Sequence, residues 1–170
     1  MKKYAFLLAA ALMAAPSVHA AQTTGGGLNT KQLYVGGGLG FNSVTNSDTG
    51  VGFQFFGGYH AGRIANNLEG DIEIGYMDTG NMDVSVNTPF GTVTANARAK
   101  GLWATGVARY ALNPQLDLIG RAGFDFGDDD GFMAGVGLGY NLSRQSQLRG
   151  EYVARDNVDS IQLNLTFNLQ

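Results

Sequence analysis

The sequence lacks cysteine altogether and has few charged residues. Without cysteine, the chain can form no disulfide, thiolate metal site, iron–sulfur cluster or cysteine nucleophile, and no cysteine can carry a lipid anchor. Charged residues make up 15% of the 170 positions, whereas soluble domains average about 25%. The formal net charge of −3 implies no basic surface. Nucleic acid is therefore not an expected partner.

Long apolar runs and prolines are also scarce. Beyond residue 20 no apolar stretch reaches the length of about 18 residues that a transmembrane helix needs, so none is predicted. The prolines are Pro16, Pro89 and Pro114. The last two fall between predicted strands, where a missing N–H interrupts no hydrogen-bonded ladder. Glycine, in contrast, is abundant, with 26 of 170 residues.

The first twenty residues are typical of a secretory signal peptide. Lys2 and Lys3 form a positive start, residues 4–15 are apolar, and Val18-His19-Ala20 resembles a cleavage site. The alternative, a retained membrane anchor, is disfavoured because the apolar run is too short to span a bilayer. Cleavage after Ala20 would leave nine basic and fourteen acidic side chains, a net charge of −5.

Apolar and polar residues alternate with a period of two along the rest of the chain. The pattern is clearest at the end, where Ile161, Leu163, Leu165, Phe167 and Leu169 alternate with polar residues. A period of two places one set of side chains on each face of a strand. The pattern predicts eight strands, near residues 31–41, 51–60, 67–78, 97–112, 115–126, 132–142, 147–155 and 161–170.

The fourth predicted strand, 97–112, is the least regular. Counting back from Tyr110 places Leu102 on its apolar face and Trp103, Val107 and Arg109 on the opposite face. A β-bulge would change this assignment.

The connections between these strands alternate in length. Short connections at 61–66, 113–114 and 143–146 lie on one side, together with both chain ends. Longer ones at 42–50, 79–96, 127–131 and 156–159 lie on the other. This pattern predicts an all-β fold, an eight-stranded antiparallel up-and-down transmembrane β-barrel with short periplasmic turns and extracellular loops. Residues 21–30 would be a periplasmic segment and residues 31–170 the barrel.

A soluble barrel with an apolar, ligand-binding interior is the alternative architecture. The membrane barrel is favoured because charged residues are scarce and the apolar faces are broad, as lipid contact requires. Tyr59, Tyr110 and Tyr140 fall at the turn-side ends of their strands, where an aromatic girdle belongs. Closure of the barrel also removes every unpaired sheet edge in lipid.

Short motifs resemble the small outer-membrane barrels. They are Glu73-Ile74-Gly75-Tyr76, the run 108–112 leading into 116–121, and Leu148-Arg149-Gly150-Glu151-Tyr152. The chain is similar to the OmpA membrane domain, the OmpX/Ail group and the outer membrane protein beta-barrel domain or porin family. Such barrels usually end on an aromatic residue, whereas here Phe167 is followed by three more residues.

The resemblance implies a location in the bacterial outer membrane after removal of the signal peptide. It also implies partners: outer-membrane lipid and lipopolysaccharide, the barrel assembly machinery with periplasmic chaperones, and an extracellular protein ligand that binds the loops. It implies no cofactor.

The polar face of the predicted strands carries charges of both signs. Glu73 and Arg121 each lie six residues past the predicted start of their strands, so their depths should match. Arg149 and Glu151 point the same way from a third strand. Unpaired buried charge is costly, so we expect these four side chains to pair inside the lumen. Three more carboxylates share this face and make the wider lumen acidic: Asp71, Asp117 and Asp125.

Other candidate sites are sparse. The glycine runs at 36–40 and 135–139 precede no helix and form no dinucleotide fingerprint, so we interpret them as space opposite large lumen side chains. His60 has no serine or carboxylate at a recognisable spacing and is interpreted as structural. Asp128–Asp130 could hold a divalent cation, but a solvated loop is the better interpretation. No catalytic, cofactor or metal residue is predicted.

The longest connection has strand-like composition at 83–87 and 92–96, with turn residues between them. The sequence predicts that the third and fourth strands continue beyond the membrane as a hairpin. Pro89 and Phe90 would then form an exposed tip suited to protein or surface contact. The alternative is a mobile loop.

Three function classes remain open. A closed barrel with a charge-plugged interior and a structural or adhesion-like role is preferred, because four lumen charges with zero net charge suit a plug better than an ion-selective lining. A narrow channel for small solutes or ions, opened when an Arg121 or Arg149 pair breaks, is the second. A lipid-modifying outer-membrane enzyme is the third, and no enzymatic activity is expected.

Overall fold

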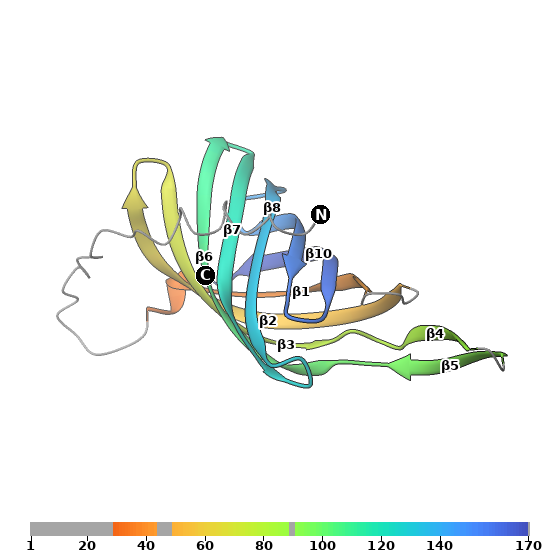
Figure 1. Cartoon of the computed structure of the whole chain (residues 1–170). Coiled ribbons are helices and arrows are strands. Elements are labelled where there is room, and N and C mark those ends of the chain that lie inside the picture. The colour runs from red at the N-terminus through yellow and green to blue at the C-terminus, as the bar shows by residue number, and fades with distance from the viewer. Residues whose placement is uncertain (1–28, 44–48, 89–90, 170) are drawn as a thin grey trace.

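The computed structural model describes residues 29–43, 49–88 and 91–169. Eight strands close into one antiparallel barrel in the order β1-β10-β9-β8-β7-β6-β3-β2, which confirms the predicted fold class. The remaining strands, β4 and β5, form a separate two-stranded sheet that projects beyond one end (Figure 1). The predicted signal peptide, residues 21–28 and the predicted tip, Pro89 and Phe90, lie outside the described residues.

Barrel and hairpin strands follow each other along the chain with one short helical turn. The barrel strands are β1 (Leu33–Ser43), β2 (Gly50–Ala65), β3 (Leu68–Asp78), β6 (Lys100–Asn113), β7 (Leu116–Gly127), β8 (Gly131–Asn141), β9 (Ser146–Ala154) and β10 (Asp159–Asn168). The hairpin strands are β4 (Met82–Thr88) and β5 (Gly91–Ala97), and a 3-10 turn, η3 (Thr30–Gln32), precedes β1. Within the described ranges, no helix is long and apolar enough to cross a bilayer.

The barrel wall is apolar outside and polar inside. In β10, Ile161 is 62% exposed on the outer face, whereas its neighbour Gln162 is 4% exposed and faces the lumen. Large apolar side chains are exposed on all eight barrel strands. Exposure of so much apolar surface to water would be unfavourable, so the outer wall is suited to contact with lipid.

The fourth barrel strand, β6, has the predicted orientation. Trp103 and Val107 are 0% and 3% exposed and face the lumen, while Leu102 and Tyr110 are 57% and 44% exposed on the outer wall. The register of β6 with β3 is uninterrupted from Tyr110 to Lys100, so no bulge changes the assignment on that side.

Several predicted strand boundaries need correction. β2 does not end at His60 but runs to Ala65, because two register shifts let it keep pairing with β3. The connection therefore shrinks to Asn66 and Asn67, and Asn67 has the positive φ of 62° that a tight turn requires. β9 ends at Ala154 rather than at Arg155.

The predicted hairpin is confirmed, but it is a separate sheet. β4 and β5 pair from Met82↔Ala97 to Thr88↔Gly91. Residues 79–81 separate β3 from β4, and residues 98–99 separate β5 from β6. Here Thr79 N–H donates to the Ala99 carbonyl at 2.9 Å, and Arg98 Nε donates to Asp78 Oδ1 at 2.8 Å. The hairpin is therefore anchored at its base.

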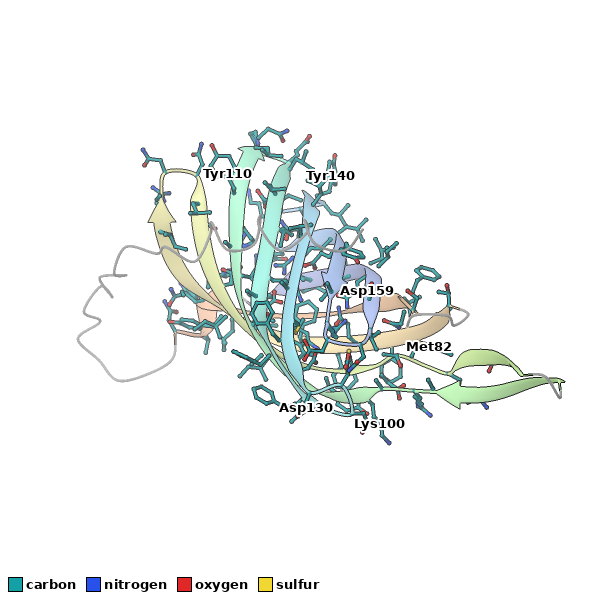
Figure 2. All side chains as sticks on the ribbon, in the orientation of Figure 1. Met82, Lys100, Tyr110, Asp130, Tyr140 and Asp159 are labelled. Atoms are coloured by element: carbon teal, nitrogen blue, oxygen red, sulfur yellow. The ribbon has the colours of Figure 1, made fainter. Side chains whose placement is uncertain are left out.

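The two ends of the barrel differ. We call the end with the short turns 66–67, 114–115 and 142–145 the turn side, and the end that carries the hairpin the loop side. Figure 2 shows Tyr110 and Tyr140 at the turn side, and Lys100 and Asp130 at the loop side. The predicted topology places the turn side in the periplasm.

Cysteine labelling tests this topology without background, because the chain has no native cysteine. A membrane-impermeant maleimide should label intact cells that carry Thr88→Cys in the hairpin. It should fail to label Asn113→Cys at the turn-side end of β6 until the outer membrane is permeabilised. Labelling of Asn113→Cys but not of Thr88→Cys in intact cells would show that the barrel has the opposite orientation.

Candidate functional site

The centre of the lumen holds an ion-pair network of four buried side chains. Glu73 comes from β3, Arg121 from β7, and Arg149 and Glu151 from β9. The nitrogen–oxygen distances are 3.0 Å for Arg121–Glu73, 2.8 Å for Arg121–Glu151 and 2.6 Å for Arg149–Glu73. The structure thus brings together the four residues that were expected to pair inside the lumen. We call them the central network.

Aromatic side chains hold the central network in place. Tyr34 Oη donates to Glu73 Oε1 at 2.6 Å, and the Arg149 guanidinium lies 5.3 Å from the Tyr34 ring centroid. The Arg121 guanidinium lies 5.5 Å from the Trp103 ring. Cation–π contact stabilises both guanidinium groups where no water reaches them.

An apolar cluster inside the lumen was not predicted. It consists of Tyr34, Phe56, Met77, Trp103, Met133 and Val153. Strand alternation assigns each of these residues to the inner face, but polar character was the signal used for that face. Trp103 was placed on the inner face, but the packing of these six side chains against one another was not predicted.

Inward glycines make room for these side chains, as the sequence predicted. A Cβ at Gly36 would collide with the Phe56 ring, and one at Gly38 with Asn164. In the second glycine run, a Cβ at Gly137 would meet Glu151 and one at Gly139 would meet Gln147. The glycine runs therefore let a narrow barrel be filled.

Toward the turn side, a second polar layer surrounds His60. Its Nδ1 lies 2.9 Å from Asp71 Oδ1, and its Nε2 lies 3.0 Å from Asn168 Oδ1. Arg109 Nε donates to the other Asp71 oxygen at 2.6 Å. The expectation that His60 lacks a carboxylate partner was wrong, because His60 and Asp71 face each other in the β2–β3 register. The groups around this imidazole are a carboxylate, an amide and a guanidinium, which suits a structural role.

Toward the loop side, a third polar layer crosses the lumen. Arg155 Nε donates to Asp125 Oδ2 at 2.7 Å, and Arg155 Nη1 donates to Ser160 Oγ at 2.8 Å. Ser160 in turn donates to Asn42 Oδ1 at 2.6 Å. Arg155 lies just beyond β9 and continues the inward alternation of Arg149 and Glu151, so its side chain is buried in the barrel. Arg109 and Arg155 thus pair with Asp71 and Asp125, whereas Asp117, the third predicted lumen carboxylate, has no cationic partner among the described residues, so the wider lumen is less acidic than the three carboxylates alone imply.

Amide side chains fill the space between the central network and this third layer. Gln54 Nε2 donates at 2.8 Å both to Gln162 Oε1 and to Asn164 Oδ1. Asn164 has no exposed surface. A pocket near Gln54 and Gln162 has a volume of only about 10 Å³. Polar layers thus follow one another along the barrel axis from Arg155 to His60.

The acidic turn at the loop side is tied to its neighbours. Asp129 is 5% exposed and accepts a hydrogen bond from Asn157 Nδ2 at 2.7 Å. Asp128 Oδ2 accepts from the Lys100 N–H at 3.2 Å. Among residues 29–43, 49–88 and 91–169, no group of three or more histidines and carboxylates is placed to hold a metal ion.

The three predicted interface tyrosines lie near the turn-side end of the wall. Tyr110 and Tyr140 are 44% and 47% exposed on the outer face. Tyr59 is half-buried, because its hydroxyl donates to Gln32 Oε1 at 2.8 Å. Their role as an aromatic girdle stays a prediction.

Comparison with known proteins identifies one family and several solved barrels. The family model described as "Outer membrane protein beta-barrel domain" matches residues 5–168. A search of curated protein sequences gave no match. A de novo designed transmembrane β-barrel aligns with a TM-score of 0.53 at 19% identity, covering 81% of this chain and 94% of that one.

Two structures of Ail from Yersinia pestis also align. Ail in a phospholipid bilayer nanodisc gives a TM-score of 0.52 at 14% identity, covering 79% of this chain and 97% of Ail. Ail in complex with the heparin analogue sucrose octasulfate gives 0.51 at 13% identity, covering 79% and 96%. At these identities the likeness is one of fold.

Proposed function

Because the chain belongs to the outer membrane protein beta-barrel domain family and is an outer-membrane β-barrel protein of bacteria, we propose that it acts as a closed barrel with a structural or surface-interaction role. Its apolar wall would contact outer-membrane lipid and lipopolysaccharide. The barrel assembly machinery and periplasmic chaperones would deliver it to the outer membrane.

The paired charges of the central network are the observation that carries the closed-barrel part of this proposal. Glu73 and Arg121 have no exposed side-chain surface, and both take part in two ion pairs. With two positive and two negative side chains, the central network has no net charge. An ion-selective pore is lined by rings of side chains with the same charge, or by rings of backbone carbonyls, along a hydrated path. Paired charges that fill a lumen block such a path.

The anchored hairpin supports the surface-interaction part. Met82 at its base packs with Ala99 and with Val158 of the β9–β10 loop, and all three are at most 7% exposed. The strands β4 and β5 then extend beyond the barrel end (Figure 1). A paired, anchored projection can present its tip to a partner with less loss of conformational entropy than a mobile loop.

Charge favours a protein partner over a sulfated glycan. Among the described residues, exposed aspartates at the loop side outnumber the exposed basic residues there, which are Arg98, paired with Asp78, and Lys100. The aspartates are Asp83, Asp128, Asp130, Asp156 and Asp159. The heparin analogue bound to Ail is a polyanion, and this surface would repel a polyanion.

Deleting the hairpin tests this role. Cells that display the wild type should adhere to at least one immobilised extracellular matrix protein about tenfold better than cells whose residues 83–96 are replaced by a short glycine–serine turn. Neither strain should bind immobilised heparin. Trp103 fluorescence checks that the shortened barrel folds. Equal adhesion by wild-type cells and by cells without the protein would contradict the surface-interaction role.

A narrow channel is the second candidate. The turn-side mouth is open, and the layer around His60 and the three ion pairs of the central network separate it from the amide layer. Breaking an Arg121 or Arg149 pair would give a brief, small pore. A lipid-modifying enzyme has the least support, because the described groups bonded to His60 are a carboxylate, an amide and a guanidinium and include no hydroxyl that His60 could activate.

A further inference from the structure

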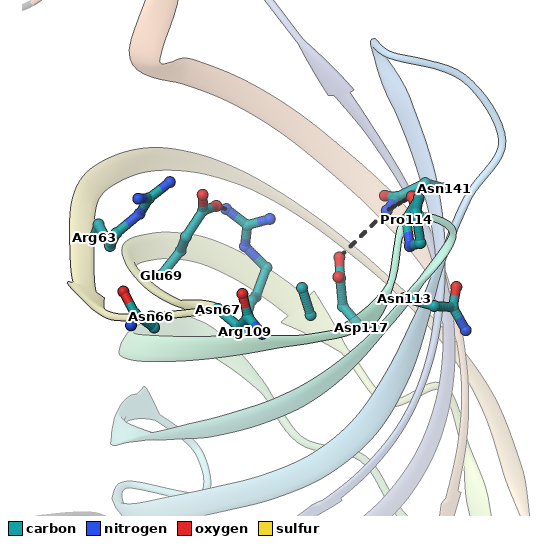
Figure 3. A pocket seen from close by; sticks show the side chains of 10 residues that line it. Arg63, Asn66, Asn67, Glu69, Arg109, Asn113, Pro114, Asp117 and Asn141 are labelled. Carbon is teal, nitrogen blue, oxygen red and sulfur yellow. Dashed lines mark hydrogen bonds and ion pairs between the residues drawn. The ribbon is translucent and has the colours of Figure 1, made fainter.

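A polar pocket opens at the turn side of the barrel. Its volume is about 340 Å³, within the range of small-ligand sites. It lies between the ends of the β2–β3 and β6–β7 hairpins (Figure 3). Its lining residues are Arg63, Asn66, Asn67, Glu69, Arg109, Ala111, Asn113, Pro114, Asp117 and Asn141. Only alanine and proline in this set are apolar, so the pocket suits a polar ligand.

Two unmatched charges of opposite sign lie apart in this pocket. Figure 3 shows Arg63, from the end of β2, at one side and Asp117, from the start of β7, toward the other. Arg63 forms no ion pair with any residue that the structure describes. The carboxylate of Asp117 accepts from the neutral amide of Gln147 at 2.7 Å, and no cation pairs with it among these residues.

The charged groups between these two ends already have ionic partners, with Arg109 shared by two carboxylates. Arg109 Nη2 donates to Glu69 Oε2 at 2.9 Å, and Arg109 Nε donates to Asp71. A ligand therefore meets one free cation and one free anion, a distribution that neither a simple anion nor a simple cation complements. A zwitterion with separated charges complements it.

Asparagine amides line the space between the two charged ends. Asn66 and Asn67 come from the β2–β3 turn, and Asn113 from the end of β6. Each primary amide offers both donors and an acceptor, which is the complement of a peptide bond. A guanidinium binds a carboxylate through two parallel hydrogen bonds.

We propose that the turn-side pocket binds a short zwitterionic peptide. The terminal carboxylate pairs with Arg63, the α-ammonium pairs with Asp117, and the asparagine amides bind the peptide bonds. The site lies at the opposite end of the barrel from the hairpin and needs no path through the lumen. It therefore holds whether or not the proposed surface role does.

Trialanine and its blocked forms test both charged contacts. NMR spectra of the refolded protein in nanodiscs should show saturable shifts of the Arg63 and asparagine side-chain signals on addition of trialanine. N-acetyl-trialanine and trialanine amide should each bind at least tenfold more weakly. Absence of saturable shifts at about 10 mM trialanine, or equal binding of all three peptides, would overturn the proposal.

Matched variants assign the contacts to residues. Arg63→Gln should weaken trialanine binding at least tenfold and remove the preference over trialanine amide. Arg144→Gln makes the same change of charge at an exposed arginine in the β8–β9 turn and should leave binding unchanged. Asp117→Asn can still accept the Gln147 hydrogen bond, and it should remove the preference over the acetylated peptide. Equal effects of Arg63→Gln and Arg144→Gln would overturn the assignment.

Discussion

Replacing Arg149 with alanine should lower the free energy of unfolding by about 3 kcal/mol, the lower end of the cost of breaking a buried ion pair. Arg149 Nη1 donates to Glu73 at 2.6 Å, and its Nε donates to Gln147 at 2.7 Å. The substitution leaves the buried Glu73 with Arg121 and Tyr34 as partners, so the carboxylate keeps part of its stabilisation. It also removes the cation over the Tyr34 ring.

Urea unfolding in phospholipid vesicles measures this loss. The chain has one tryptophan, and Trp103 lies fully buried in the lumen next to Arg121, so its fluorescence reports on the packed interior. Arg144→Ala removes an exposed arginine from a turn and should change stability by less than about 0.5 kcal/mol. Equal stability of the Arg149→Ala barrel and the wild type would contradict the role given to the central network.

Adding one methyl group at Gly58 should destabilise the barrel by about 1–3 kcal/mol, the usual cost of overpacking. A Cβ at this position would collide with the hydroxyl-bearing end of the Tyr34 ring. That ring is 1% exposed and its hydroxyl is bonded to Glu73, so it has little freedom to move away. The effect of Gly58→Ala should therefore reach the central network.

The adjacent glycine supplies the matched control. A Cβ at Gly57 would meet nothing within 4 Å, because this residue faces outward. Gly57→Ala should be neutral or slightly stabilising, since alanine loses less backbone entropy than glycine on folding. The same urea titrations compare the two variants. Equal destabilisation by both would mean that the glycines serve the strand backbone and do not make space in the lumen.

The alternation of side chains accounts for most of what could be predicted. A period of two is a local signal, so it located the barrel strands and assigned Trp103 and Leu102 to opposite faces of β6. The central network was predictable because Glu73 and Arg121 are equally far from their turns. Because acidic and basic side chains share the inner face, they were expected to form ion pairs.

Contacts that depend on the register between strands, or on how far along the barrel a residue lies, were not predictable. His60 meets Asp71 only because β2 continues through two register shifts beyond His60. Alternation puts Arg155 on the inner face with Arg149 and Glu151, but its pairing with Asp125 depends on where β7 and β9 place the two residues along the barrel. Neither event has a signature in the local pattern of residue types, since both depend on how neighbouring strands align.

Single-channel recording of the refolded mature protein in a planar bilayer tests the closed lumen most directly. The account predicts no stable open conductance for the wild type, because paired charges and amides fill the barrel from Arg155 to His60. Arg149→Ala should show brief, small openings, since one cation of the central network is gone. A large, stable open conductance in the wild type would contradict the closed barrel and make this protein a channel.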